Sequence, residues 1–356
     1  MSFLQFGQNT TVNKYEKLGY LDNPFPTRGK VAPEIYVERP ELSQLQQELN
    51  SFLSSNERDG SFWALEASKG IGKSNFLRHL EWEIKQAKQK EQLPLTVVCE
   101  YIDSSFISPR DLVEKLVFTI GEENFNALFK HKVKLPKTVQ GTDLWRFFES
   151  PDIQQSAFGN IENPHTQFLM KWLMGTATTV KEREKYTIWS KDRMPPAVAF
   201  SYLRVLITCM KQAGILDKIL LLIDEFENIQ HLERRKKTEF IQTFKSMLNC
   251  FNWEMLFVII AGQESAFTTI GSQYTSLADR WRRKSLKPIQ SSKQAIELAQ
   301  TYMQYAHEIY CQNDKNIKPL KPSEDEIKII YADLSKEVTQ RDLLDALHQW
   351  IENEVK

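Results

Sequence analysis

Apolar runs of strand length recur along the chain and alternate with segments of helical periodicity. Residues 219–223 (Ile-Leu-Leu-Leu-Ile) and 255–261 contain no polar side chain, which is typical of parallel strands that are covered on both faces. Residues 95–102 are rich in β-forming residues, and residues 62–65 form a further short apolar run. We therefore predict an α/β fold in which helices flank a parallel sheet.

Helical periodicity dominates the last part of the chain, where no further strand is predicted. Amphipathic helices are expected at about residues 292–312, 323–334 and 339–353. The last of them begins with Thr339 and Asp342, which have the spacing of a capping box. These helices predict a small all-helical lid domain after the sheet.

The pattern predicts three regions. We expect an N-terminal extension over residues 1–35, a core over residues 36–290 and the helical lid domain over residues 291–356. Between about residues 124 and 197 the pattern is irregular, and its prolines and helical stretches favour a mostly helical insertion in the core. We interpret the aromatic residues of this insertion as local core and not as a ligand cage.

Composition narrows the class of protein. The chain has 356 residues, of which 46 are basic and 46 acidic, so its net charge does not indicate a nucleic-acid binder. The four cysteines are widely spaced, which favours buried thiols in a reducing compartment over a disulfide framework or a zinc site. No apolar run approaches the roughly 18 residues of a membrane span, and no secretion signal opens the sequence. We therefore expect a soluble, cytoplasmic protein.

A glycine-bearing turn follows the apolar run at 62–65 and opens an amphipathic helix. It matches the phosphate-binding P-loop pattern, except that Ala67 stands where the first glycine is expected. Glycines allow the backbone N–H groups to turn inward around a phosphate, and the helix N-terminus adds partial positive charge. The residues expected to bind a nucleotide here are Ser68, Lys69, Gly70, Ile71, Gly72, Lys73, Ser74 and Asn75.

An acidic pair ends the run at 219–223 and supplies the second part of a nucleotide site. Asp224 is expected to hold Mg²⁺ together with the Ser74 hydroxyl, and Glu225 to polarise an attacking water. Gln263 follows the second apolar run, where its side chain either senses the γ-phosphate or caps the strand. The P-loop and the acidic pair together predict a Mg²⁺-dependent ATP site.

These motifs resemble those of the AAA+ ATPases, in particular the origin-recognition-like branch, over most of the chain. In that family a segment similar to the one around Arg39 lies near the adenine, which implies a role for Arg39 in nucleotide binding. Residues 275–283 are similar to the segment that carries an arginine finger, with Arg280 the best match, acting in cis or on a neighbouring subunit. Residues 338–344 resemble the start of a lid helix whose sensor arginine is here Arg341.

Two short segments resemble a narrower group. Asn23-Pro24-Phe25-Pro26 and Trp172-Leu-Met-Gly175 are similar to segments of ATP-binding proteins from prokaryotic phage-exclusion (BREX-type) defence systems. The resemblance implies an ATPase whose ATP hydrolysis drives a conformational switch in a homo-oligomer. It also implies partner proteins of a multi-component system and a DNA-related process such as phage defence.

Two other interpretations stay open. The first is a nucleotide-binding scaffold with negligible hydrolysis, for which Ala67 and Gln263 leave room. The second is an ATP-dependent DNA loader or clamp, in which the basic residues at 234–237 and 280–284 contact DNA phosphates.

Overall fold

The computed structural model describes residues 14–27, 32–103, 108–154, 163–190, 193–251, 254–311, 318–334 and 337–355. The chain divides into two compact units. The sheet unit comprises Glu41–Glu66 and Glu83–Lys284, and the helical unit comprises Met1–Pro40, Ala67–Trp82 and Ser285–Lys356.

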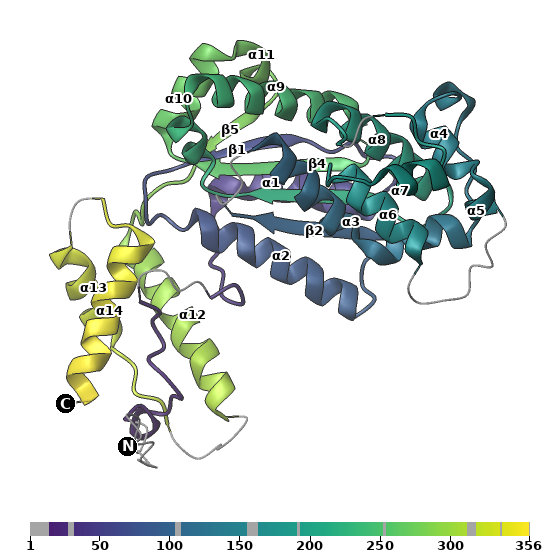
Figure 1. Ribbon diagram of the computed structural model, residues 1–356. Helices are drawn as coiled ribbons and strands as arrows, with labels where there is room; N and C mark the ends of the chain where they lie inside the picture. The colour runs from purple at the N-terminus through teal and green to yellow at the C-terminus, as the bar shows by residue number, and fades with distance from the viewer. Residues whose placement is uncertain are drawn as a thin grey trace, which may run out of the picture. The chain divides into compact units, whose positions relative to one another are not determined.

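A five-stranded sheet organises the sheet unit (Figure 1), in the order β2-β3-β4-β1-β5. Its strands are β1 (Phe62–Glu66), β2 (Val97–Ile102), β3 (Lys218–Ile223), β4 (Leu256–Gly262) and β5 (Arg282–Ser285). The pairs β1/β4, β3/β4 and β2/β3 are parallel. Every residue of β1, β3 and β4 is buried, because these strands are covered on both faces. The predicted fold class, a parallel sheet flanked by helices, is confirmed.

One strand was not predicted. The sequence of β5 is Arg-Arg-Lys-Ser, and its residues are mostly exposed. An edge strand of charged residues has neither the apolar run nor the alternation from which a strand is recognised.

Most helices of the sheet unit border one hydrophobic core, to which the buried residues of α1 (Ser43–Ser54) do not belong. The helices of this unit are α1, α3 (Pro109–Lys130), α4 (Asp143–Phe148), α5 (Pro151–Gln154), α6 (Pro164–Leu173), α7 (Val180–Lys185), α8 (Pro196–Gln212), α9 (Arg234–Cys250), α10 (Glu264–Gln273) and α11 (Thr275–Ala278). Short 3₁₀ turns lie at Pro40–Leu42, Lys137–Val139 and Phe226–His231. A capping box with reciprocal bonds between Ser108 and Asp111 begins α3.

Aromatic side chains fill the core around α4, α6 and α7. The Phe168 ring lies 4.3 Å from the Tyr186 ring and 6.4 Å from the Trp172 ring, measured between centroids. Phe147 contacts all three of these rings, and Trp172 is fully buried. The interpretation of these aromatic residues as local core is therefore confirmed.

Three long helices form the helical unit, as the periodicity predicted. They are α12 (Ser292–Cys311), α13 (Glu324–Asp333) and α14 (Gln340–Val355), and the P-loop helix α2 (Lys73–Gln89) begins in this unit. Thr339 and Asp342 make the expected reciprocal capping bonds at the start of α14. Tyr20 and Phe25 are fully buried in the core of this unit together with Leu347.

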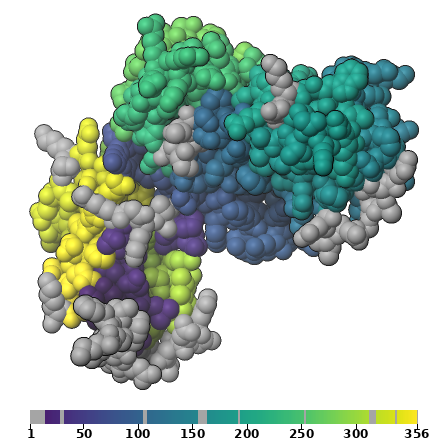
Figure 2. Space-filling view, in the orientation of Figure 1, coloured from purple at the N-terminus to yellow at the C-terminus, as the bar shows by residue number. Residues whose placement is uncertain are grey.

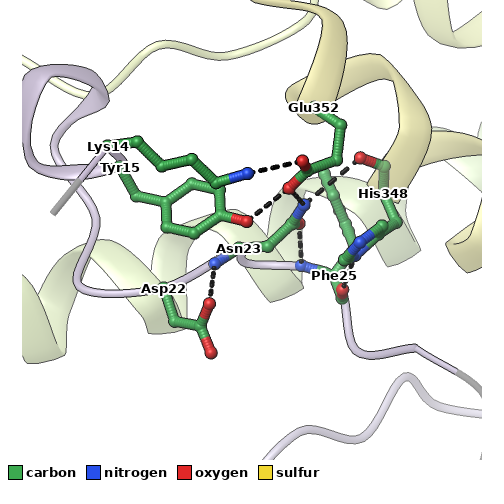
Figure 3. Close-up of polar contacts among 7 residues, drawn as sticks. All are labelled: Lys14, Tyr15, Asp22, Asn23, Phe25, His348 and Glu352. Carbon is green, nitrogen blue, oxygen red and sulfur yellow. Dashed lines mark hydrogen bonds and ion pairs between the residues drawn. The ribbon is translucent and has the colours of Figure 1, made fainter. Parts of the chain in front are cut away.

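The N-terminal segment lies along this helical core (Figure 2, purple between yellow and yellow-green). The Glu352 carboxylate of α14 accepts hydrogen bonds from Lys14 Nζ (2.6 Å), Tyr15 and Asn23 Nδ2 (3.4 Å), as Figure 3 shows. One turn earlier in α14, His348 Nδ1 lies 2.8 Å from the Phe25 carbonyl oxygen. The Asn-Pro-Phe-Pro segment is thus bound to α14 through polar and apolar contacts.

The structure bears on two expectations from composition, which concern membrane-spanning helices and the cysteines. Among the described residues, no helix combines the length and the apolar character that a bilayer crossing requires. The four cysteines are thiols, but only Cys209 is buried. The expectation of four buried thiols was therefore wrong for Cys99, Cys250 and Cys311, which are half-exposed.

Candidate functional site

The P-loop joins β1 to α2 and has the backbone that its sequence predicts. Gly70 has a φ of +89° and Gly72 a φ of +107°, which other residues rarely adopt. Ala67 is not among the described non-glycine residues with positive φ. Ala67, which replaces the first glycine of the P-loop pattern, therefore causes no backbone strain.

Lys73 begins α2 and points back into the loop. Its side chain is buried, and Nζ donates to the carbonyl oxygens of Ala67 (2.8 Å) and Ser68 (3.1 Å). The Lys73 ammonium, the Ser74 hydroxyl and the first N–H groups of a 17-residue helix form a set of donors that fits a phosphate. The residues present therefore fit the expected phosphate group.

Residues from other parts of the helical unit contact the loop. Arg39 Nη2 donates to the Ile71 carbonyl oxygen (2.6 Å), and Asn75 Nδ2 donates to the Ile35 carbonyl oxygen (2.9 Å). The backbone N–H of Arg341, in the first turn of α14, donates to the Gly70 carbonyl oxygen (3.1 Å). The expected site residues Arg39 and Arg341 thus contact the P-loop, and Asn75, within the loop sequence, binds Ile35.

The acidic pair lies at the carboxyl end of β3 in the sheet unit. Asp224 is buried, and its carboxylate accepts hydrogen bonds from the Tyr101 hydroxyl (2.7 Å) and the Glu225 N–H (2.8 Å). Each carboxylate oxygen has a second lone pair, so the group retains the oxygen ligands that Mg²⁺ prefers. The chemistry of Asp224 fits a metal ligand.

Glu225 has an unusual backbone. Its φ of 49° and ψ of 39° are left-handed, although the residue is not glycine. The side chain is exposed, and its Oε2 accepts from Asn228 Nδ2 (3.2 Å). Such a conformation costs about 1–3 kcal/mol and is often found at functional sites.

Gln263 follows β4 at the same edge of the sheet. Its Nε2 donates to Glu227 Oε1 (3.1 Å), and its backbone N–H donates to Glu227 Oε2 (3.2 Å). It is also the N-cap residue of α10, although its side chain makes no capping bond. Glu227 thus binds Gln263 at the end of β4, the strand that pairs with β3.

Arg280 lies at the opposite edge of the sheet from Asp224. Its guanidinium donates to Asn249 Oδ1, and it lines a cavity of about 1190 Å³ with Ser61 and Phe62, at the amino end of β1. Because β1, β3 and β4 are parallel, this end faces away from the carboxyl ends of the strands. The structure therefore does not bring Arg280 together with the acidic pair of its own chain.

The neighbouring arginines have acidic partners. Arg283 Nε donates to Glu66 Oε2 (3.0 Å), and Arg282 pairs with Glu48. Glu66 is buried at the end of β1. The basic run at 280–284 is therefore largely held by contacts within the sheet unit.

Sequence reasoning missed three residues of these arrangements. Tyr101 binds Asp224, Glu227 binds Gln263, and the Gln340 side chain packs against Gly72 and Arg39. A tyrosine near the end of a strand beside the acidic strand is a weak signal for the first of them. No signal in the sequence pointed to Glu227 or Gln340.

Similar folds occur among solved structures. The ORC2 protein of Aeropyrum pernix (ADPNP–ADP complexes) is 11% identical, with 91% of this chain and 72% of that chain covered and a TM-score of 0.41. The Walker-type ATPase PABY2304 of Pyrococcus abyssi is 15% identical, with 93% and 72% covered and a TM-score of 0.47. AMPPCP-bound DnaA from Aquifex aeolicus is 9% identical, with 92% and 67% covered and a TM-score of 0.39. No curated protein matches the sequence.

A family model described as BREX system ATP-binding protein BrxC/D matches residues 153–310. The matched residues hold Trp172, Asp224, Gln263 and Arg280, whereas the P-loop and the Asn-Pro-Phe-Pro segment lie outside them. Over residues 153–310 the chain is therefore similar to the BREX system ATP-binding proteins BrxC/D, and the resemblance expected from the sequence is confirmed.

Proposed function

We propose that the chain binds ATP at the P-loop and hydrolyses it with Mg²⁺ as cofactor. The P-loop carries the proposal, because its two glycines with positive φ lead into the N-terminus of a helix that begins with Lys73. The description of the family that matches residues 153–310 as ATP-binding supports the same nucleotide.

Phosphate and metal are assigned to different chemical groups of the chain. The backbone of residues 68–75 and the Lys73 ammonium hold the phosphates, and Ser74 and Asp224 hold the magnesium ion. When bound, Mg²⁺ neutralises charge on the phosphate oxygens. Tyr101 keeps the Asp224 carboxylate in one orientation through its hydrogen bond.

Three further residues act on the γ-phosphate side. The Glu225 carboxylate is exposed directly after Asp224, and it orients the attacking water. Gln263 and Arg341 sense the γ-phosphate, Gln263 from the end of β4 and Arg341 from the first turn of α14. Arg39 supports the loop through its bond to the Ile71 carbonyl oxygen.

Arg280 acts in trans in a homo-oligomer. Its place at the amino end of β1, in an open cavity, supports this assignment over action on the same chain's own site. A guanidinium supplied by a neighbouring subunit stabilises the charge that phosphoryl transfer spreads over the phosphate oxygens.

The ATPase serves a DNA-related process in the cytoplasm, namely phage defence, together with partner proteins of a multi-component system. The likeness of residues 153–310 to BREX system proteins supports this role. The output of the ATPase is a conformational switch of the homo-oligomer.

Phosphate release from ATP tests the proposal. Glu225→Gln should lower turnover about 100-fold, the size expected for loss of a general base, while ATP binding persists. Lys73→Ala should abolish ATP binding. If the wild-type chain turns over ATP no faster than the Glu225→Gln variant, the proposed hydrolysis is refuted.

That negative result would favour a second function, a nucleotide-binding scaffold with negligible hydrolysis. One observation supports it: the Gln263 amide is bound by Glu227, which competes with sensing of a γ-phosphate. The scaffold predicts that ATP promotes assembly equally in the wild type and in Glu225→Gln, as mass photometry would show.

A further inference from the structure

The first turn of α14 packs directly against the two glycines of the P-loop. A Cβ atom at Gly72 would lie 2.2 Å from Gln340 Oε1, and one at Gly70 would lie 3.0 Å from Thr339 Oγ1. The Arg341 N–H donates to the Gly70 carbonyl oxygen at 3.1 Å. The absence of side chains at Gly70 and Gly72 therefore serves the approach of this helix as well as the turn of the loop.

Arg39 bridges the loop and α14. Its Nη2 donates to the Ile71 carbonyl oxygen (2.6 Å) and to Gln340 Oε1 (3.4 Å), and its Nη1 donates to the Lys287 carbonyl oxygen (3.0 Å). A planar guanidinium reaches several acceptors at once, which a lysine ammonium on a single stem does less well.

Gln340 extends this network into the core of the helical unit. Only 9% of the residue is exposed, and its Nε2 donates to the Tyr302 hydroxyl at 3.4 Å. Burial raises the pKa of Tyr302 to about 12, so its hydroxyl keeps its proton in the physiological range. A buried amide with partners on both sides holds one orientation, because each lost partner leaves a costly unpaired group.

We propose that Arg39 and Gln340 are positioning residues that couple phosphate binding in the P-loop to the first turn of α14. The proposal rests on the proposed ATP binding. Phosphate would bind the backbone N–H groups of residues 70–72. On the same residues, Arg39 binds the Ile71 carbonyl oxygen, Gln340 packs against Gly72, and the Arg341 N–H binds the Gly70 carbonyl oxygen. The two sets of contacts stabilise one loop conformation together, so each strengthens the other. Arg341, the next residue of α14, is placed by the same coupling.

Hydrogen exchange and ATP affinity measured on the full chain test this coupling. In the wild type, the ATP analogue AMPPNP with Mg²⁺ should protect residues 67–75 and also residues 339–343. Gln340→Ala and Arg39→Ala should each weaken AMPPNP binding about tenfold, the size of a typical coupling between sites. In both variants the loop should still be protected at saturation, whereas residues 339–343 should not.

The double variant and a matched control separate coupling from simple destabilisation. Because Arg39 and Gln340 form one network, the double alanine variant should bind AMPPNP no more weakly than either single variant. Gln349→Ala, at an exposed glutamine of the same helix, should leave affinity and protection unchanged. If Gln340→Ala does not fold, Gln340→Asn replaces it, since the shorter amide cannot reach both Arg39 and Tyr302.

The outcomes distinguish the two proposals. Protection of residues 67–75 without protection of residues 339–343 in the wild type overturns the coupling and leaves ATP binding intact. Full additivity of the two alanine substitutions also overturns it. No protection anywhere in the wild type refutes ATP binding itself.

Discussion

At the scale of single residues, Glu225 combines an exposed carboxylate with a left-handed backbone. Glycine adopts the same φ without strain. Glu225→Gly should therefore raise the free energy of unfolding by about 1 kcal/mol while abolishing ATP turnover. Chemical unfolding and phosphate release on the same preparation would measure both effects.

A second left-handed residue provides the matched control. Lys132 has a φ of 47° and an exposed side chain. Lys132→Gly should give a similar gain in stability with unchanged turnover. If Glu225→Gly instead keeps its activity, the carboxylate does not orient the attacking water.

The residues that sequence reasoning identified and those it missed differ in the range of their contacts. Lys73 and Asp224 belong to local patterns in which one strand or helix end defines the chemistry. The side chains of Tyr101 and Gln340 act on partners 123 and 301 positions away, respectively. No local pattern encodes such a pairing, because it exists only once the chain has folded.

At the scale of elements, α9 begins with four consecutive basic residues, Arg234 to Lys237, although the positive end of a helix dipole lies there. Its first turn contains no acidic residue, and Glu233 makes no side-chain capping bond. Replacing Arg235 and Lys236 by glutamate should therefore stabilise the protein by about 0.3–1 kcal/mol per charge. Thermal unfolding at low salt would measure the gain.

The same double substitution tests the DNA loader interpretation. If residues 234–237 contact DNA phosphates, duplex affinity should fall and the salt dependence should lose about one unit of slope per lost contact. Lys88 lies in the last turn of α2, where a positive charge is favourable. Lys88→Glu should therefore lower the stability of the protein and leave its DNA binding unchanged. Unchanged DNA binding in the α9 variant would exclude this cluster from the DNA contact.

The contact between α14 and the N-terminal segment should depend on pH. Hydrogen bonds from Lys14 and Tyr15 lower the pKa of Glu352 from 4.5 to about 2. A carboxyl group whose pKa is lowered by folding contributes stability above its unfolded pKa, and it loses that contribution as the pH falls. The stability difference between the wild type and Glu352→Gln should be complete above about pH 4.5 and vanish towards pH 2.

Unfolding curves at several pH values would test this dependence. Glu354→Gln provides a matched control, because Glu354 is an exposed carboxylate on the same helix. A difference between wild type and Glu352→Gln that stays constant from pH 5 to pH 2.5 would contradict the role assigned to Glu352.

Strands with an apolar run and helices with a clear periodicity were predicted from the sequence, whereas the charged strand β5 was not. The apolar strands β1, β3 and β4 and the helices α12 and α14 agree with the predicted segments. Strand β5 was missed because pairing with β1, and not its own Arg-Arg-Lys-Ser sequence, makes it a strand. Its side chains are satisfied by contacts such as that of Arg283 with Glu66.

At the scale of the whole molecule, an arginine finger in trans predicts complementation between two inactive variants. Lys73→Ala and Arg280→Ala should each lose hydrolysis. Mixed in equal amounts, they should recover about one quarter of wild-type turnover, because chance places an intact P-loop beside an intact Arg280 at one interface in four. No recovery on mixing, with assembly confirmed by mass photometry, would exclude action in trans.

The helical unit consists of three separate stretches of the chain, and this arrangement has a consequence for biosynthesis. All of the sheet unit has been synthesised once translation reaches Lys284, whereas Arg39 and its partner Gln340 are 301 positions apart. Contacts between distant positions form late, because the intervening chain must first be made and the loop entropy overcome. We therefore expect a nascent chain to form its sheet before α14 can support the P-loop, and nucleotide binding to follow only after α14 has been synthesised.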